Sequence, residues 1–152
     1  MNNKSLQQLI VAFVRALESA DLLFLDKYLT RDVTYARETP RPTEVHGKEE
    51  VITRMEAFLR AFPGWSLHAG DISADAAQRQ VMCSLYIMGA STAEMDFRTL
   101  GQGVYEATGK PFALPPGWLV LTVRGAEIQR IDIGFPEGGG LVGIFDQIGV
   151  HR

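Results

Sequence analysis

The stretch Phe62-Pro63-Gly64-Trp65 divides the chain into two parts that differ in hydrophobic periodicity. In the part before it, apolar residues recur every three or four positions, which is typical of amphipathic helices. In the part after it, short apolar or alternating runs are separated by turn residues, which is typical of β-strands. Because Pro-Gly is itself a turn signal, this stretch predicts a chain that forms helices first and a sheet afterwards.

Three helices are predicted before this turn. Ser5 and Gln8 have the spacing of a capping box at the start of the first helix. Asp21 can cap the second helix, which is short and stops near Thr30. The third begins at Lys48. Apolar residues at helical spacing place the first helix at 5–19 and the third at 48–62.

Two segments separate the second helix from the third. Residues 32–37 are short and contain Val, Thr and Tyr, which favour strands, so they predict the first strand. Residues 39–46 contain Pro40 and Pro42, and each proline disfavours helix at the residue before it. This second segment is predicted to be a loop.

The part after the turn predicts a sheet and one more helix. Glycines and prolines interrupt residues 92–116, which predicts strand only in part, and 141–148 predict a short terminal helix. Helices followed by several strands without intervening helices favour a single α+β domain over 1–152, with an antiparallel sheet covered by helices on one face. The predicted strands are 65–73, 78–91, 117–124 and 127–134.

The composition of the 152-residue chain argues against several classes of partner. With 46% apolar and 22% charged residues, it resembles a compact soluble protein. A net charge of −3 without a basic cluster does not fit a nucleic-acid partner. No run of 18 or more apolar residues and no signal peptide is seen, so we expect no membrane association and a cytoplasmic location.

The residue types that usually hold metals or nucleotides are sparse. Cys83 is the only cysteine, which excludes an intramolecular disulfide and a thiolate cluster, and we expect it to pack in the core. The three histidines lack metal-ligand spacing. Residues 101–103 lack the third glycine of a dinucleotide-binding fingerprint, and residues 108–110 lack the upstream glycine of a P-loop. We therefore expect neither a metal nor a cofactor.

The two faces of the run 78–91 differ in chemistry. Alternate residues of a strand point to opposite faces, and one face here is uniformly apolar, which predicts a core face. The other face mixes apolar side chains with hydroxyl groups, as ligand pockets do, although a half-exposed sheet face fits it equally well. The core face holds Val81, Cys83, Leu85 and Ile87, and the mixed face holds Met82, Ser84, Tyr86 and Met88.

Asp132 is a candidate general base. An aspartate within a strand is unfavourable by propensity, which singles this residue out among the acidic residues of the chain. Its neighbours on the same face are Arg130, which could hold it ionised, and Gly134, which would leave room beside it. A carboxylate at the mouth of an apolar cavity could abstract a proton next to a carbonyl group. The alternative is an Asp-Arg pair on an exposed face.

Tyr35 and Arg37 share one face of the first predicted strand. They could present a hydroxyl group and a fixed cation to an enolate or carboxylate oxygen. An exposed edge strand would fit the same pattern. Trp118 opens an apolar strand, where its ring could form the floor of a pocket or fill the core.

Several weak motifs, taken in order, resemble the SnoaL-like polyketide cyclases of the nuclear-transport-factor-2-like superfamily. The resemblance implies a cone-shaped, curved antiparallel sheet with three N-terminal helices enclosing an apolar pocket, and a short C-terminal helix. It also implies homodimers that form through the open sheet face. The motifs are the segment 18–35, the FPGW stretch at 62–65, Gly89 to Met95, Thr108-Gly109-Lys110, Gly125 to Ile128, and the terminal FDQIG at 145–149.

In that family a carboxylate on the last strand is the acid/base of a cofactor-independent ring closure. The resemblance therefore implies a cyclase or isomerase acting on a hydrophobic, carbonyl-bearing, polyketide-like intermediate, with Asp132 as acid/base. Glu137 is a second candidate, because the segment 135–140 is longer than usual for the family, and Ser91 stands where the family commonly has histidine. The predicted site consists of Asp132, Glu137 and Tyr35 as catalytic residues, with Arg37, Met82, Ser84, Tyr86, Trp118 and Phe135 contacting the substrate.

Two other functions remain open from the sequence. Enzymes similar to limonene-epoxide hydrolase share the fold, and Tyr35 and Arg37 occupy positions similar to their Tyr and Asn. However, Ser84 and Tyr86 stand where the Arg and Asp that activate water would be needed. A non-catalytic small-molecule-binding or dimerisation module is the third hypothesis, because fold resemblance alone does not establish activity.

Overall fold

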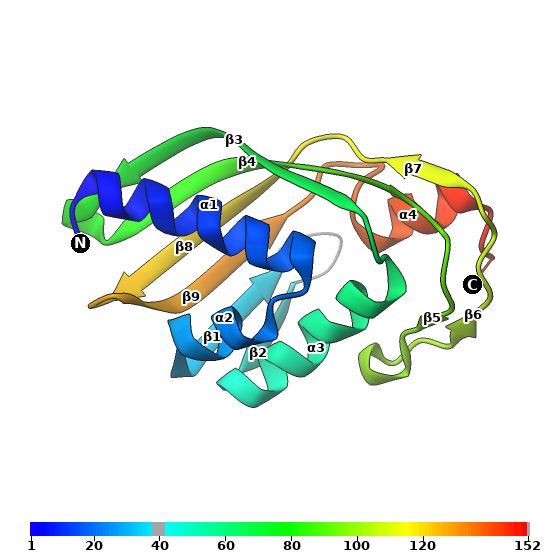
Figure 1. Ribbon diagram of the computed structural model, residues 1–152, viewed down its shortest axis with the longest axis horizontal. Helices are drawn as coiled ribbons and strands as arrows, with labels where there is room; N and C mark the ends of the chain where they lie inside the picture. Colours follow the sequence, from blue (N-terminus) through cyan, green and yellow to red (C-terminus); the bar gives the residue numbers. More distant parts are fainter. Residues whose placement is uncertain (38–41, 152) are drawn as a thin grey trace.

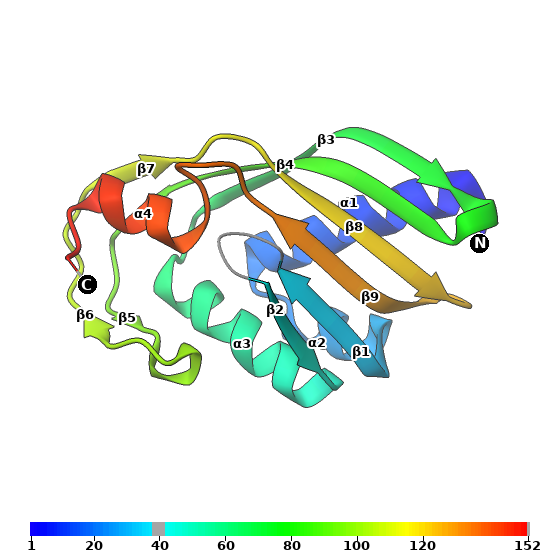
Figure 2. The same ribbon diagram turned by 180° about the vertical axis from the view of Figure 1, so that it is seen from behind.

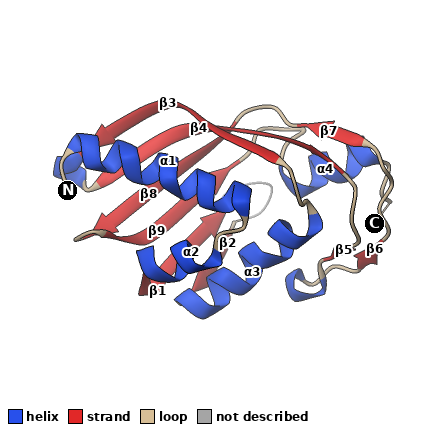
Figure 3. Ribbon diagram, viewed as in Figure 1, coloured by secondary structure: helices blue, strands red, loops and turns tan. Residues whose placement is uncertain are grey.

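A computed structural model describes residues 1–37 and 42–151 of the chain. Three helices, α1 (Asn3–Ser19), α2 (Leu22–Tyr28) and α3 (Lys48–Ala61), lie on one side of a curved sheet. Figure 1 shows these helices in front of the sheet, and Figure 2 shows the opposite face of the sheet from behind. A fourth helix, α4 (Gly140–Ile148), lies beside β7 (Pro111–Ala113) at one end (Figure 3). None of the helices within residues 1–37 and 42–151 combines the length and the apolar character that a membrane-spanning helix needs.

The main sheet brings the two halves of the chain together. Its strands follow the order β2-β1-β9-β8-β4-β3, and β7 pairs with the end of β4. Two very short strands, β5 (Met95–Asp96) and β6 (Val104–Tyr105), form a separate pair. The six strands in this order are β1 (Leu29–Arg37), β2 (Thr43–His46), β3 (Ser66–Asp75), β4 (Gln80–Ala90), β8 (Gly117–Arg124) and β9 (Glu127–Gly134).

The predicted α+β class is confirmed, with two local differences. Residues 43–46 of the predicted loop form strand β2, because β1 supplies hydrogen-bond partners that a four-residue segment cannot reveal in its own sequence. Residues 39–41 of that prediction lie outside the described residues. In addition, β1 and β9 run parallel, whereas the sequence predicts an antiparallel sheet. No tight turn joins these distant strands, so nothing local forces them to run antiparallel.

The helix starts follow from short side-chain hydrogen bonds. Asp21 caps α2 as predicted, since its Oδ1 accepts a hydrogen bond from the Phe24 amide at 3.0 Å. For α1 the cap is Asn2, whose Oδ1 accepts from the Ser5 amide at 2.8 Å. The predicted capping box at Ser5 is therefore wrong by three residues, because Asn2 offers an equally good acceptor one turn earlier.

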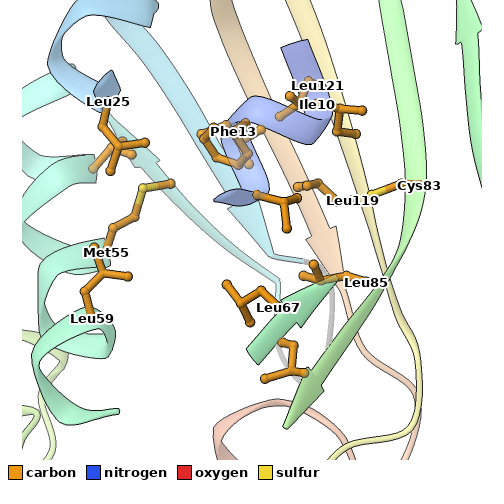
Figure 4. Packing of buried hydrophobic residues seen from close by; sticks show 14 of the residues in the cluster. Ile10, Phe13, Leu25, Met55, Leu59, Leu67, Cys83, Leu85, Leu119 and Leu121 are labelled. Atoms are coloured by element: carbon orange, nitrogen blue, oxygen red, sulfur yellow. The ribbon is translucent and has the colours of Figure 1, made fainter. Parts of the chain in front are cut away.

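The main core lies between the three N-terminal helices and the inner face of the sheet. Figure 4 shows side chains of these helices pointing toward those of β3, β4 and β8. The predicted core face of β4 is confirmed, since its four residues are each at most 8% exposed. The labelled side chains in Figure 4 are Ile10, Phe13, Leu25, Met55, Leu59, Leu67, Cys83, Leu85, Leu119 and Leu121.

We expect Leu121→Ala to lower the free energy of unfolding by about 2–5 kcal/mol, because the buried side chain leaves a cavity behind. Leu23→Ala is the matched control, since Leu23 in α2 is 84% exposed and should change stability little. Urea denaturation followed by circular dichroism measures both. Equal losses in the two variants would contradict this description of the core.

We expect the Cys83 thiol to be unreactive in the folded protein. Burial raises its pKa to about 11, so little of the reactive thiolate exists at neutral pH. Labelling with a maleimide should therefore be slow in buffer and fast in guanidinium chloride. Equally fast labelling under both conditions would show that the β4 core face is open.

Candidate functional site

A cavity of about 620 Å³ lies between the inner face of the sheet and the helices α3 and α4. Most of its walls are apolar, and Figure 4 shows four of the lining side chains, Met55, Leu59, Leu67 and Leu85, pointing toward one another. Helix α4 adds Leu141, Val142, Ile144 and Phe145. A mostly apolar cavity of this size is typical of small-molecule sites.

Few polar side chains reach this cavity. Tyr35 and Arg37 come from β1, and Gln102 comes from the loop before β6. Trp65 also lines the cavity, but its indole N–H donates to the Leu17 carbonyl oxygen at 3.4 Å. Among the described residues, no Asp, Glu or His lines it.

Tyr35 is placed to act as a hydrogen-bond donor. Burial raises the pKa of its phenol, and the nearby Arg37 and Arg54 guanidinium groups partly oppose this rise. The phenol therefore keeps its proton at neutral pH. It can donate that proton to a ligand oxygen, and it cannot serve as a ready base.

Arg37 has unused hydrogen-bonding capacity beside Tyr35. One terminal nitrogen, Nη2, donates to Thr43 Oγ1 at 3.4 Å. Its Nε is buried and has no hydrogen-bond partner among the described residues. A buried donor left unsatisfied costs about 1–3 kcal/mol, so an acceptor on a ligand would be favoured here.

The structure does not place Asp132 at the cavity, which corrects the sequence expectation. The flanking Ile131 and Ile133 point to the inner side, where Ile133 lines the cavity, and strand alternation turns Asp132 to the outer face. There its two carboxylate oxygens accept from Arg130 Nε at 3.1 and 3.0 Å. Arg130 Nη1 also lies 3.6 Å from Glu44 Oε1. The geometry is that of the Asp-Arg pair on the outer face.

The mixed face of β4 also lies away from the cavity. Leu85 and Ile87, from the predicted core face, line the cavity instead. The expectation that the mixed face lines the pocket is corrected, because the helices cover the more apolar face. The residues placed outside are Met82, Ser84 and Tyr86.

Two further predicted residues are also outside the cavity. Trp118 lies over Gly134, where an added Cβ would come within 2.1 Å of the indole, so the space expected beside Asp132 is filled. Glu137 is exposed in the turn after β9. Of the nine predicted site residues, the cavity brings together Tyr35, Arg37 and Phe135.

Sequence reasoning missed the contribution of Gln102 and of α4. Gln102 stands between two glycines, a pattern that indicates only a turn. The apolar residues of α3 and α4 were predictable as core residues, but where a core leaves a cavity depends on the three-dimensional packing. The described residues contain no group of three or more His, Cys, Asp or Glu side chains that could hold a metal ion.

Comparison with solved structures shows the same fold at low sequence identity. A protein assigned as a SnoaL-like polyketide cyclase from Jannaschia sp. CCS1 is 13% identical, with a TM-score of 0.74 over 99% of this chain and 95% of that one. AclR from Streptomyces galilaeus, assigned as a hydroxylase, is 16% identical, with a TM-score of 0.76 over 99% and 100%. An epoxide hydrolase of Mycobacterium tuberculosis, similar to limonene-epoxide hydrolase, is 14% identical, with a TM-score of 0.69 over 97% and 94%.

Sequence comparison gives the family. A search of curated proteins finds no match. The family model described as the SnoaL-like domain matches residues 10–131, which is most of the chain. Together with the curved sheet and its covering helices, this match shows that the chain belongs to the SnoaL-like family, with the fold of the nuclear-transport-factor-2-like superfamily.

Proposed function

We propose that the protein is a cofactor-independent cyclase or isomerase that acts on a hydrophobic, carbonyl-bearing, polyketide-like intermediate. The observation that supports this proposal is the pair of donors, Tyr35 and Arg37, in a cavity of about 620 Å³ that is otherwise largely apolar. Apolar walls displace much of the water around the ligand, so hydrogen bonds to a carbonyl oxygen are stronger there than in bulk water.

The donors suit a reaction in which negative charge develops on oxygen. When a C–H bond next to the carbonyl breaks, the electron pair of that bond forms the enolate, and the proton passes to water or hydroxide that reaches the ligand from the solvent. Tyr35 O–H and one of the five N–H groups of Arg37 stabilise the enolate oxygen, and the other Arg37 N–H groups stay available for a second oxygen of the ligand. The enolate then takes up a proton at another carbon of its conjugated system, which gives an isomer, or its carbon forms a bond to a second carbonyl carbon of the same molecule, whose oxygen takes up the proton, which closes a ring.

This proposal differs from the acid/base role predicted for Asp132 or Glu137. Neither residue lines the cavity, and the described lining contains no carboxylate to act as base. The chain would contribute donors and a shaped, mostly apolar cavity rather than a proton acceptor. The two accounts predict opposite effects of substitution.

Enolisation of a simple probe distinguishes them. 2-Tetralone is a bicyclic ketone whose exchange of α-hydrogen for deuterium in D₂O can be followed by proton NMR. We expect the protein to accelerate exchange, and Tyr35→Phe to lower the rate by about a hundredfold, the scale for loss of one donor to a developing oxyanion. Asp132→Asn should exchange at the rate of the unmodified protein, because its side chain lies on the other face of the sheet.

Circular dichroism confirms that both variants are folded before their rates are compared. Loss of exchange in Asp132→Asn with full activity in Tyr35→Phe would favour the carboxylate account. No acceleration by the unmodified protein would contradict the proposed enolisation of this class of ketone.

Epoxide opening is the second candidate function. It is favoured by the similarity in fold to the mycobacterial epoxide hydrolase and by the protonated Tyr35 phenol, which could donate a proton to an epoxide oxygen. Styrene oxide in water enriched in oxygen-18 separates the candidates: hydrolysis gives a labelled diol.

The third hypothesis, a binding module, fits a protein that binds both probes and transforms neither.

We also propose that two copies of the chain pair through the outer face of the sheet. Met82, Tyr86 and Met88 project from β4 on this face and are 48%, 38% and 55% exposed. The ion group formed by Arg130, Asp132 and Glu44 lies on the same face. An apolar strip next to charges of both signs can be self-complementary across a two-fold axis.

Sedimentation tests this pairing. We expect sedimentation equilibrium to give the unmodified protein a mass twice that of the 16.8 kDa chain. Met88→Glu should shift it to the monomer, because a charge would be buried in the interface. Leu23→Glu, the same change at an exposed residue on the helical side, should remain a dimer. A monomeric unmodified protein would contradict the proposal.

A further inference from the structure

A small second cavity adjoins the main one and is lined by cations. It has a volume of about 120 Å³ and lies between α3, β1 and β2, where it shares Tyr35 and Arg37 with the main cavity. We call this second cavity the annex. Its further polar lining comes from Thr43, Arg54 and Gln102.

The annex contains two guanidinium groups and, in the described lining, no carboxylate. Arg54 pairs with Glu50 on the same helix, with Nε and Oε1 3.4 Å apart, but the Glu50 side chain is 56% exposed. An exposed pair of this kind contributes little and leaves the charge of Arg54 available. Arg37 keeps a buried Nε–H without a partner among the described residues.

Tyr35 lies within the field of both cations. Arg37 and Arg54 each lower the pKa of its phenol against the effect of burial, which places the two positive groups near one hydroxyl at the junction of the two cavities. The other lining of the annex is apolar, and includes Val45, Val51 and Leu100. Two positive groups in partly apolar surroundings favour a compact anion.

We propose that the ligand of this protein is a hydrophobic keto acid, whose carboxylate enters the annex and binds Arg37 and Arg54. Guanidinium groups match the planar carboxylate through paired N–H donors. The hydrophobic body would then fill the main cavity, with the ketone oxygen next to Tyr35. This inference rests on the proposed function, since it names the class of molecule on which the site would act.

Binding of a matched pair of neutral and charged probes tests the inference. 2-Naphthylacetic acid and 2-naphthylacetamide have the same shape, but only the acid is charged at neutral pH. We expect isothermal titration calorimetry to show that the acid binds at least about tenfold more tightly, the scale of a charge-assisted hydrogen bond. High salt should weaken the binding of the acid and leave the binding of the amide unchanged.

Arg54→Gln should remove most of this preference, because Arg54 lines the annex and not the main cavity. We expect it to lower the affinity for the acid by about tenfold and to leave that for the amide unchanged. Arg60→Gln is the matched control: Arg60 lies on the same helix, also pairs with a glutamate four residues away, Glu56, and lines neither cavity. It should bind both probes as the unmodified protein does.

The outcomes separate this inference from the proposed function. Equal affinities for acid and amide, or equal losses for both in Arg54→Gln, would overturn the keto-acid assignment and leave the apolar cavity as a ligand site. No binding of either probe would overturn both.

Discussion

The parallel pairing of β1 with β9 is the constraint on which the site depends. In this register Tyr35 lies opposite Ile131 and Arg37 lies opposite Ile133. Side chains opposite each other in adjacent strands share a face, so the burial of Ile131 and the position of Ile133 in the cavity lining go with Tyr35 and Arg37 on the cavity side. The same register turns Asp132 to the outer face. A shift of one residue would exchange the two sets.

The two faces of the sheet consequently differ in electrostatic character. On the outer face, Arg130 is paired with Asp132 and Glu44, so positive and negative charges neutralise each other close to solvent. On the inner face, Arg37 meets no carboxylate among the described residues that line the two cavities. The chain carries 18 acidic and 15 basic residues, yet the charged side chains among the described lining of the two cavities are arginines. The lining of the candidate site therefore carries positive charge, although the net charge of the chain is negative.

Regular local patterns made most of the fold predictable. β8 and β9 begin and end where the turn residues predict, and Asp21 caps its helix, because these features depend on near neighbours in the sequence. β2 was not predictable, since its four residues become a strand only through pairing with β1.

The candidate site was predictable only in part. Tyr35 and Arg37 were identified from their shared strand face. The core face of β4 was identified correctly, but the mixed face of β4 and the Asp132 face of β9 were expected to line the pocket and lie on the outer face instead, because hydroxyl groups and a carboxylate suit either a pocket or an exposed sheet. Which face the helices cover is decided by apolar burial over several strands. Leu85 and Ile87 therefore line the cavity. In the sequence, each of these residues indicates only a position in the core.

We expect the ligand to bind on the inner face of the sheet, beside Tyr35. Carbon-13 labelling of the four tyrosine rings, with Tyr35 and Tyr86 assigned through Phe variants, tests this claim in one NMR titration with 2-tetralone. Tyr35 lines the cavity and Tyr86 projects from the outer face, so we expect the Tyr35 resonance to shift and the Tyr86 resonance to stay unchanged. A shift of Tyr86 with Tyr35 unchanged would contradict the account.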